Sequence, residues 1–251
     1  MKKLLLFSFI LLLANVALKA QSDANSRLYE LRTYYVPEGK MENLLNRFRQ
    51  HSLKLFYKHN MRAEGFWIPL DNKDNKLVYL MSYPSREARE KSWKDFFDDK
   101  EWKKVKAESE KEGTLVAKVE SVFLKTTDFS PNNLKSVGDR VFELRTYKAT
   151  TDHLPNLLSR FRDHTVKLFE NYGMTNIIYW TPTDKEQGSD DMLIYFLTHK
   201  TKEAGLASFK AFGGSAEWQA VRKASEEKAG GSLTVFVKSE YMMPTDFSPI
   251  K

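Results

Sequence analysis

The chain first alternates regularly between apolar and polar positions at residues 27–35. Successive side chains of a strand point to opposite faces, so this stretch predicts a strand with Glu30, Arg32 and Tyr34 on one face. Residues 38–58 follow with apolar side chains at intervals of three and four. That spacing predicts an amphipathic helix.

The stretch after this helix predicts two more strands, a broken helical region and a last strand. The two strands are expected at residues 66–70 and 76–83, on either side of a polar turn. Helical spacing continues over residues 85–111, interrupted by an Asp-Asp pair that can cap the second piece. Residues 114–125 are expected to form the final strand.

The whole pattern occurs twice, which indicates an internal duplication. The sequence Glu-Leu-Arg-Thr-Tyr at residues 30–34 recurs at residues 143–147. Of the 40 positions that begin at Glu30, 18 are identical in the second copy. After Asp184 the offset between the copies grows by three residues, because the loop there is longer in the second copy. Each copy ends in Thr-Asp-Phe-Ser-Pro.

Each copy has the element order βαββαβ, which is the ferredoxin-like module. Helices cover one face of its four-stranded sheet and leave the other face bare. The second copy can cover that face, so we expect an α+β protein in which two tandem ferredoxin-like modules form an intramolecular dimeric α/β barrel. The modules are expected at residues 27–125 and 140–249, joined by a polar linker at 126–139. Two modules strung on this linker without a shared core are the alternative.

The first twenty residues have the layout of a secretory signal peptide. Two lysines precede an apolar run, and Ala20 offers a small residue at the expected cleavage point. The run is too short to span a membrane, which takes about 20 apolar residues. We therefore expect residues 1–20 to be removed and the protein to be exported to the periplasm or beyond, with no membrane span left. A retained N-terminal anchor is the alternative.

Charge and composition exclude several classes of function. Loss of the three lysines within residues 1–20 lowers the formal net charge from +7 to +4, and the remaining charges of both signs are interleaved. Such mixing is typical of solvated helix faces, so we expect no nucleic acid as a partner. The chain has no cysteine, which excludes disulfides and thiolate chemistry.

The polar face of the first strand is the first candidate for chemistry. Glu30, Arg32 and Tyr34 project the same way, so a carboxylate, a guanidinium and a phenol could together bind a polar ligand group. A structural Glu–Arg pair explains the same pattern, because ion pairs perturb carboxylates with or without a function. The second copy repeats the set as Glu143, Arg145 and Tyr147.

A histidine in the first helix is the second candidate. In a regular helix, His51 falls in one stripe with Leu44, Phe48 and Leu55, and His164 takes the same place in the second copy. An imidazole on an apolar face needs a hydrogen-bond partner or a ligand. His51 is therefore either a satisfied core residue or a ligand-binding residue.

No motif assigns a cofactor or a reaction. The sequence has no HExxH or His-x-His spacing, no glycine-rich phosphate loop and no nucleophile motif. We expect no metal site, while a haem held through His51 or His164 stays an open alternative and the cofactor is undetermined. The five tryptophans, which include Trp67 and Trp180, are most simply core residues.

These motifs together resemble the NIPSNAP family. The resemblance rests on the Tyr/Phe-Glu-Leu-Arg-Thr-Tyr strand and on the helix that ends Arg-x-His-x-x-x-Lys-Leu-Phe, with its following Met. It also rests on Ser-Arg-Glu-Ala-Arg-Glu-Lys-Ser-Trp leading to Asp-Lys-Glu-Trp, at residues 85–93 and 99–102. The resemblance implies the dimeric α/β-barrel fold that small monooxygenases, haem-handling proteins and EthD-like proteins share. It implies no defined reaction.

The two copies differ where the family motif is strongest. Arg89 aligns with Gly205, and Trp93 aligns with Phe209. A ligand site that needs the arginine and the tryptophan is therefore intact only in the first module.

Two functions are compatible with the sequence, and neither requires the protein to be an enzyme. The first is binding of a small molecule in a barrel pocket of the first module, with oxygenase-like or haem-related chemistry as an extension. The second is that of a non-catalytic envelope module that recognises a protein or a glycan. Either function is compatible with further assembly into a homo-oligomer. The candidate ligand-binding residues are His51, Glu30, Arg32, Tyr34, Trp67, Arg89 and Trp93, and their second-module equivalents are His164, Glu143, Arg145, Tyr147 and Trp180.

Overall fold

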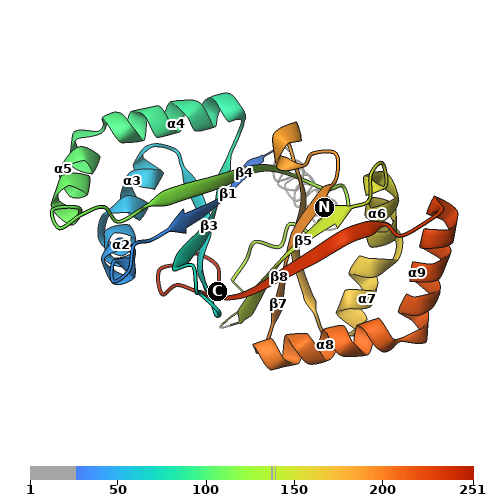
Figure 1. Cartoon of the computed structure of the whole chain (residues 1–251). Helices are drawn as coiled ribbons and strands as arrows, with labels where there is room; N and C mark the ends of the chain where they lie inside the picture. The colour runs from blue at the N-terminus through green and yellow to red at the C-terminus, as the bar shows by residue number, and fades with distance from the viewer. Residues whose placement is uncertain (1–26, 137, 139) are drawn as a thin grey trace, which may run out of the picture.

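The computed structural model describes residues 27–136, 138 and 140–251 (Figure 1). The predicted signal peptide, residues 1–20, lies outside the described residues. Across the part of the chain that is described, no helix combines the length and the apolar character that crossing a membrane requires.

The first copy forms the predicted βαββαβ module. Its strands are β1 (Leu28–Tyr35), β2 (Arg62–Pro69), β3 (Lys76–Tyr83) and β4 (Lys118–Thr126). Its helical segments are α2 (Met41–Arg47), the π-helical turn η1 (Phe48–Ser52), α3 (Leu53–Lys58), α4 (Arg86–Asp98) and α5 (Lys100–Ser109). The Asp-Asp pair ends α4 and begins α5, where Asp99 Oδ1 accepts a hydrogen bond from the Glu101 N–H at 2.7 Å.

The second copy repeats this order. Its strands are β5 (Val141–Ala149), β6 (Thr175–Pro182), β7 (Met192–His199) and β8 (Thr234–Pro244). Its helical segments are α6 (Leu154–Arg160), the π-helical turn η2 (Phe161–Thr165), α7 (Val166–Asn171), the 3₁₀ turn η3 (Lys185–Gln187), α8 (Lys202–Gly214) and α9 (Ala216–Ala229). The turn η3 lies in the longer loop of this copy.

The two sheets close into one barrel, as the sequence predicted. The strand order is β1-β3-β2-β8-β5-β7-β6-β4, and neighbouring strands are antiparallel. The last strand of each module crosses over, because β4 pairs with β6 and β8 pairs with β2. The helices of the two modules lie on opposite outer sides of the barrel (Figure 1). Two modules without a shared core are therefore excluded.

Apolar side chains from both sheets fill the space between them. Trp67 and Trp180 are fully buried in this shared core, and the rings of Trp67 and Phe196 lie 4.8 Å apart between centroids. Two further apolar clusters lie between each sheet and its own helices. The bare face of each sheet is thus covered by the other module.

The repeated Thr-Asp-Phe-Ser-Pro segments are exchanged between the modules. In the first segment, which the sequence placed in a surface linker, Ser130 Oγ accepts a hydrogen bond from the Tyr179 N–H at 2.9 Å. In the second segment, Ser248 Oγ accepts from the Phe66 N–H at 3.0 Å. The threonine and the serine of each segment are buried, so each tail is anchored to the other module and helps to hold the barrel closed.

Candidate functional site

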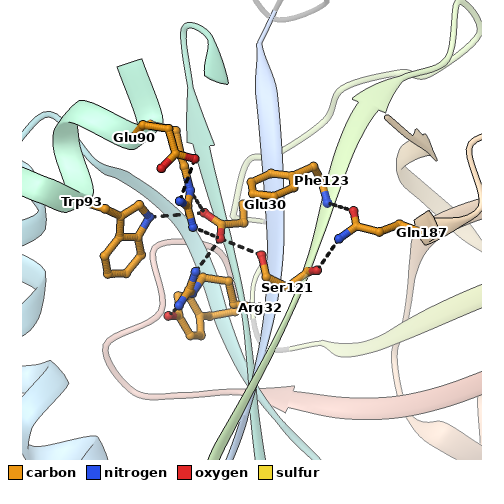
Figure 2. Close-up of polar contacts among 9 residues, drawn as sticks. Glu30, Arg32, Glu90, Trp93, Ser121, Phe123 and Gln187 are labelled. Carbon is orange, nitrogen blue, oxygen red and sulfur yellow. Dashed lines mark hydrogen bonds and ion pairs between the residues drawn. The ribbon is translucent and has the colours of Figure 1, made fainter. Parts of the chain in front are cut away.

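A buried carboxylate, Glu30 on β1, is the centre of a polar cluster in the first module (Figure 2). Arg89 on α4 donates to both of its oxygens, from Nε at 3.0 Å and from Nη2 at 2.7 Å. Ser121 Oγ on β4 donates at 2.6 Å, Trp93 Nε1 on α4 donates at 3.3 Å, and Arg32 Nη1 adds an ion pair. Donors from two strands and one helix therefore satisfy a carboxylate that water does not reach.

This environment holds Glu30 as an anion. Burial alone would raise the pKa of Glu30, but the hydrogen bond from Arg89 and the positive charge of Arg32 outweigh it and lower the pKa to about 2. Two guanidiniums face one carboxylate, so the buried cluster carries a net positive charge. The exposed Glu90 carboxylate, 3.0 Å from Arg89 Nη1 at the rim, offsets part of it.

Arg32 connects this cluster to aromatic side chains. Its Nε donates to Tyr79 Oη at 2.7 Å. Its guanidinium carbon lies 4.4 Å from the ring centroid of Trp93 and 5.6 Å from that of Tyr34. These distances are typical of cation–π contacts, which fix the plane of the guanidinium as well as its position.

The same arginine lines a cavity of about 230 Å³ between the first sheet and its helices. Arg47 and Glu110 in the lining neutralise each other at 2.7 Å, which leaves Arg32 and Lys106 as its positive groups. The volume is below the roughly 300–1,000 Å³ of pockets for drug-sized ligands, so it suits a compact molecule. The apolar walls are formed by Phe48, Phe56, Trp93, Phe96, Phe97, Trp102, Val116 and Val119.

His51 does not belong to this site, and the expectation that it lies in the apolar stripe is wrong. The Leu53 N–H bonds to the Phe48 carbonyl, five residues earlier, which widens this turn by one residue. Ser52 is buried in consequence and His51 is exposed. The second module has the same π-helical turn, and His164 is exposed in the same way. Each histidine lines a separate surface groove.

Trp67 also lies apart from the cavity. Its neighbours Phe66 and Ile68 on β2 face the helices, so alternation along the strand turns Trp67 into the core between the two modules. Trp180 is buried in the same core. The structure thus gathers five of the predicted residues and separates two from them. The gathered residues are Glu30, Arg32, Tyr34, Arg89 and Trp93.

Sequence reasoning missed Ser121 and Tyr79. Ser121 lies opposite Arg32 in the pairing of β1 with β4, which places its hydroxyl beside the polar face of β1. The duplication contained a signal for it, because Ser239 stands at the same distance before the second Thr-Asp-Phe-Ser-Pro segment. Ser239 Oγ donates to Glu143 at 2.6 Å. A serine repeated on the last strand of both modules therefore marks the carboxylate site.

The second module keeps the buried carboxylate but changes its partners. Glu143 accepts from Arg145 Nη1 at 2.5 Å and lies 2.7 Å from Nε2 of His199, the residue that aligns with Tyr83. Burial would raise the pKa of Glu143, but the contact with His199 and the charge of Arg145 lower it. A histidine from β7 thus replaces the helix arginine of the first module. Among the described residues, one guanidinium contacts this carboxylate, that of Arg145.

Gly205 provides the room for His199. A Cβ at this position would lie 2.9 Å from the His199 ring and 3.0 Å from Tyr241 Cε1, which is too close. Gly205→Ala is therefore expected to lower the free energy of unfolding by about 1–3 kcal/mol, measured by chemical denaturation. Gly213→Ala on the same helix is the control, because a Cβ there meets nothing within 4 Å. Equal losses from both substitutions would rule out the packing explanation.

In the described part of the chain, no group of three or more His, Asp or Glu side chains could hold a metal ion. The comparison with protein families matches the NIPSNAP family at residues 29–131 and again at 142–249. The chain belongs to the NIPSNAP family. Its two matched segments contain the two carboxylate clusters, so each cluster is part of one NIPSNAP domain. No curated relative matches this NIPSNAP protein.

Several solved structures are similar to this chain. A NIPSNAP domain protein from Burkholderia xenovorans is 24% identical over 41% of this chain and 98% of its own, with a TM-score of 0.37. A candidate monooxygenase from Lactobacillus acidophilus NCFM aligns over 87% of this chain and 94% of its own, at 8% identity and a TM-score of 0.57. An anthrone oxidase-like protein aligns over 90% and 95%, at 12% identity and a TM-score of 0.52. The last two likenesses show the common fold alone.

Proposed function

We propose that this NIPSNAP protein binds a compact aromatic anion in the cavity of its first module. The observation that carries the proposal is the buried cluster at the cavity wall, in which Arg32 and Arg89 outnumber the single carboxylate of Glu30. A phenolate or an aryl carboxylate would balance the remaining charge through Arg32. Its ring would pack against the aromatic walls, Trp93 among them.

A ligand series that varies only in charge tests this proposal. Salicylate and benzoate are the anionic probes, benzyl alcohol is neutral and benzylamine is cationic. We expect the anions to raise the Tm with increasing concentration and to change the fluorescence of Trp93 and Trp102, which line the cavity. The proposal is contradicted if the changes in Tm and fluorescence do not depend on the charge of the probe, or if no probe produces them.

A tryptophan in the cavity should block the ligand. Val119 on β4 lines the cavity and is 44% exposed; Val237 on β8 takes the equivalent place opposite Tyr147 and is 43% exposed. Val119→Trp is expected to weaken salicylate binding at least tenfold, about 1.4 kcal/mol, by occupying its space. Val237→Trp is the matched control and should bind as the wild type does. Isothermal titration of both variants decides, and equal affinities would place the ligand elsewhere.

We propose further that the protein acts outside the cytoplasm and that oxygenase-like chemistry follows binding. Residues 1–20 support export. The shared barrel of a candidate monooxygenase and an anthrone oxidase-like protein supports the reaction class. A phenolate held by Arg32 is more easily oxidised than the neutral phenol, and oxygen uptake with phenolic probes tests this step. Haem-related chemistry has less support, because neither His51 nor His164 lines the cavity.

One observation favours the alternative, a non-catalytic envelope module that recognises another protein. Strand β8 exposes three apolar side chains, those of Val235, Phe236 and Val237. One edge of β8 pairs with β5 along most of its length. On the other edge, the described pairing with β2 is limited to residues 242–244. An open strand edge with apolar side chains is suited to pairing with another chain. A photoreactive amino acid at position 236 should then give one discrete crosslinked adduct in intact cells. The same amino acid in place of Lys118, the equivalent position of the first module, should give none. No adduct from position 236 would count against this alternative.

A further inference from the structure

The longer loop of the second module contacts the site of the first. Gln187, at the end of η3, uses both ends of its side-chain amide (Figure 2). Its Oε1 accepts from the Phe123 N–H at 2.8 Å, and its Nε2 donates to the Ser121 carbonyl at 2.8 Å. One side chain therefore pairs with the outer edge of β4 as a neighbouring strand would.

This edge of β4 carries part of the carboxylate site. Ser121 Oγ donates to Glu30 at 2.6 Å, and the ring of Phe123 lies 5.2 Å from the guanidinium carbon of Arg89. In the described part of the chain, β6 pairs with β4 at residues 124–126, and the Thr183 N–H just beyond β6 donates to the Phe123 carbonyl at 2.8 Å. Gln187 therefore supports the stretch of β4 that the barrel leaves without a second strand.

The same loop also holds the helix that supplies the other donors. Arg86, in the first turn of α4, donates to Asp184 Oδ1 at 2.5 Å and to Thr183 Oγ1 at 3.0 Å. Its guanidinium carbon lies 3.8 Å from the ring centroid of Phe123. The loop thus contacts β4 and α4 together, and these two elements supply Ser121, Arg89 and Trp93 to Glu30.

The shorter loop of the first module is built differently. The side chain of Asn72 closes its own turn, with bonds of 2.6 and 2.9 Å to the backbone of Lys76. The cluster of the second module takes its last partner, His199, from a strand of its own sheet. The longer loop of the second module therefore contacts the one site that depends on a helix arginine, that of the first module.

We propose that Gln187 is a positioning residue of the first-module ligand site. By fixing the edge of β4, it keeps the Glu30–Arg89–Ser121 cluster assembled and Arg32 directed at the cavity. The second module is then a structural component of the first module's site. The part of this inference that concerns ligand affinity rests on the proposed binding of aromatic anions.

The variant Gln187→Ala tests the inference, with Gln219→Ala on the exposed face of the second module as the control. We expect Gln187→Ala to weaken salicylate binding three- to tenfold and to speed amide hydrogen exchange at Phe123, while the control matches the wild type. Gln187→Glu, which can accept from Phe123 but cannot donate to Ser121, should fall between them. Wild-type affinity in Gln187→Ala would overturn the inference.

A second readout needs no ligand and separates this inference from the proposed function. If the cluster loosens, the pKa of Glu30 is lowered less by its partners, so Gln187→Ala should lose less free energy of unfolding than the wild type between pH 5 and pH 2. A loop that only adds general stability would lower the free energy of unfolding by the same amount at pH 5 and at pH 2. If the wild type binds none of the aromatic probes, the proposed function fails. The loss of unfolding free energy between pH 5 and pH 2 and the exchange at Phe123 then still decide whether Gln187 positions the cluster.

Discussion

Glu30→Gln is expected to lower the free energy of unfolding by about 3–5 kcal/mol, because it leaves Arg32 and Arg89 in a buried site without an anion. Glutamine matches the shape of glutamate, so packing changes little and the loss reports the charge. Urea denaturation at neutral pH measures it. The size of the loss should not depend on moderate salt, since the pair is shielded from solvent.

The pH dependence of stability should change in the same variant. The pKa of Glu30 is about 2 in the folded protein, below its ordinary value of 4.5, so its contribution is complete above about pH 5 and is lost as the pH falls toward 2. The difference corresponds to about 3 kcal/mol, at about 1.4 kcal/mol for each pKa unit. Glu30→Gln should therefore lose less stability than the wild type between pH 5 and pH 2. Parallel acid curves for the two proteins would contradict this origin of the effect.

Glu143→Gln is the matched variant of the second module. It leaves one buried guanidinium without its anion, that of Arg145, whereas Glu30→Gln leaves two. We therefore expect a smaller loss than for Glu30→Gln. If Glu143→Gln loses as much free energy of unfolding as Glu30→Gln, or more, the additional guanidinium of Arg89 does not explain the energetic difference between the two clusters.

The barrel could be predicted because it follows from a property that each copy shows by itself. A sheet with helices on one face needs cover for the other, and the duplication supplies it within one chain. The set of Glu30, Arg32 and Tyr34 was also predictable, because alternation along a strand fixes which side chains share a face. Arg89 and Trp93 could be named from the family motif, but their contact with Glu30 depends on where α4 lies over the sheet.

The errors have equally specific causes. The π-helical turn at Phe48–Ser52 changes the helical phase by one residue, and a regular period of 3.6 cannot show this, so His51 was placed on the wrong side. Gln187 could not be found at all from local patterns. It acts across the barrel on a strand of the other module, and only the closed fold brings it to Ser121. What a sequence shows for one face of a regular strand is therefore more dependable than what it shows across a π-helical turn or for contacts between modules.

Trp180→Ala is expected to lower the free energy of unfolding by about 3–5 kcal/mol and to affect both modules together. The ring of Trp180 lies 5.8 Å from that of Tyr29 in the first module and 5.7 Å from that of Phe196 in the second, so its loss opens a cavity in the shared core. Far-ultraviolet circular dichroism and tryptophan fluorescence should still report one coincident transition, at lower denaturant.

Two controls show whether this loss comes from the shared core. Trp180→Phe keeps an aromatic ring and removes a buried N–H that has no hydrogen-bond partner among the described residues, so it should cost much less. Trp218→Ala removes a tryptophan that packs only on the helix side of the second module, and its loss should be smaller than that of Trp180→Ala. Two separate transitions in Trp180→Ala, with the first module as stable as before, would mean that the modules do not fold as one barrel.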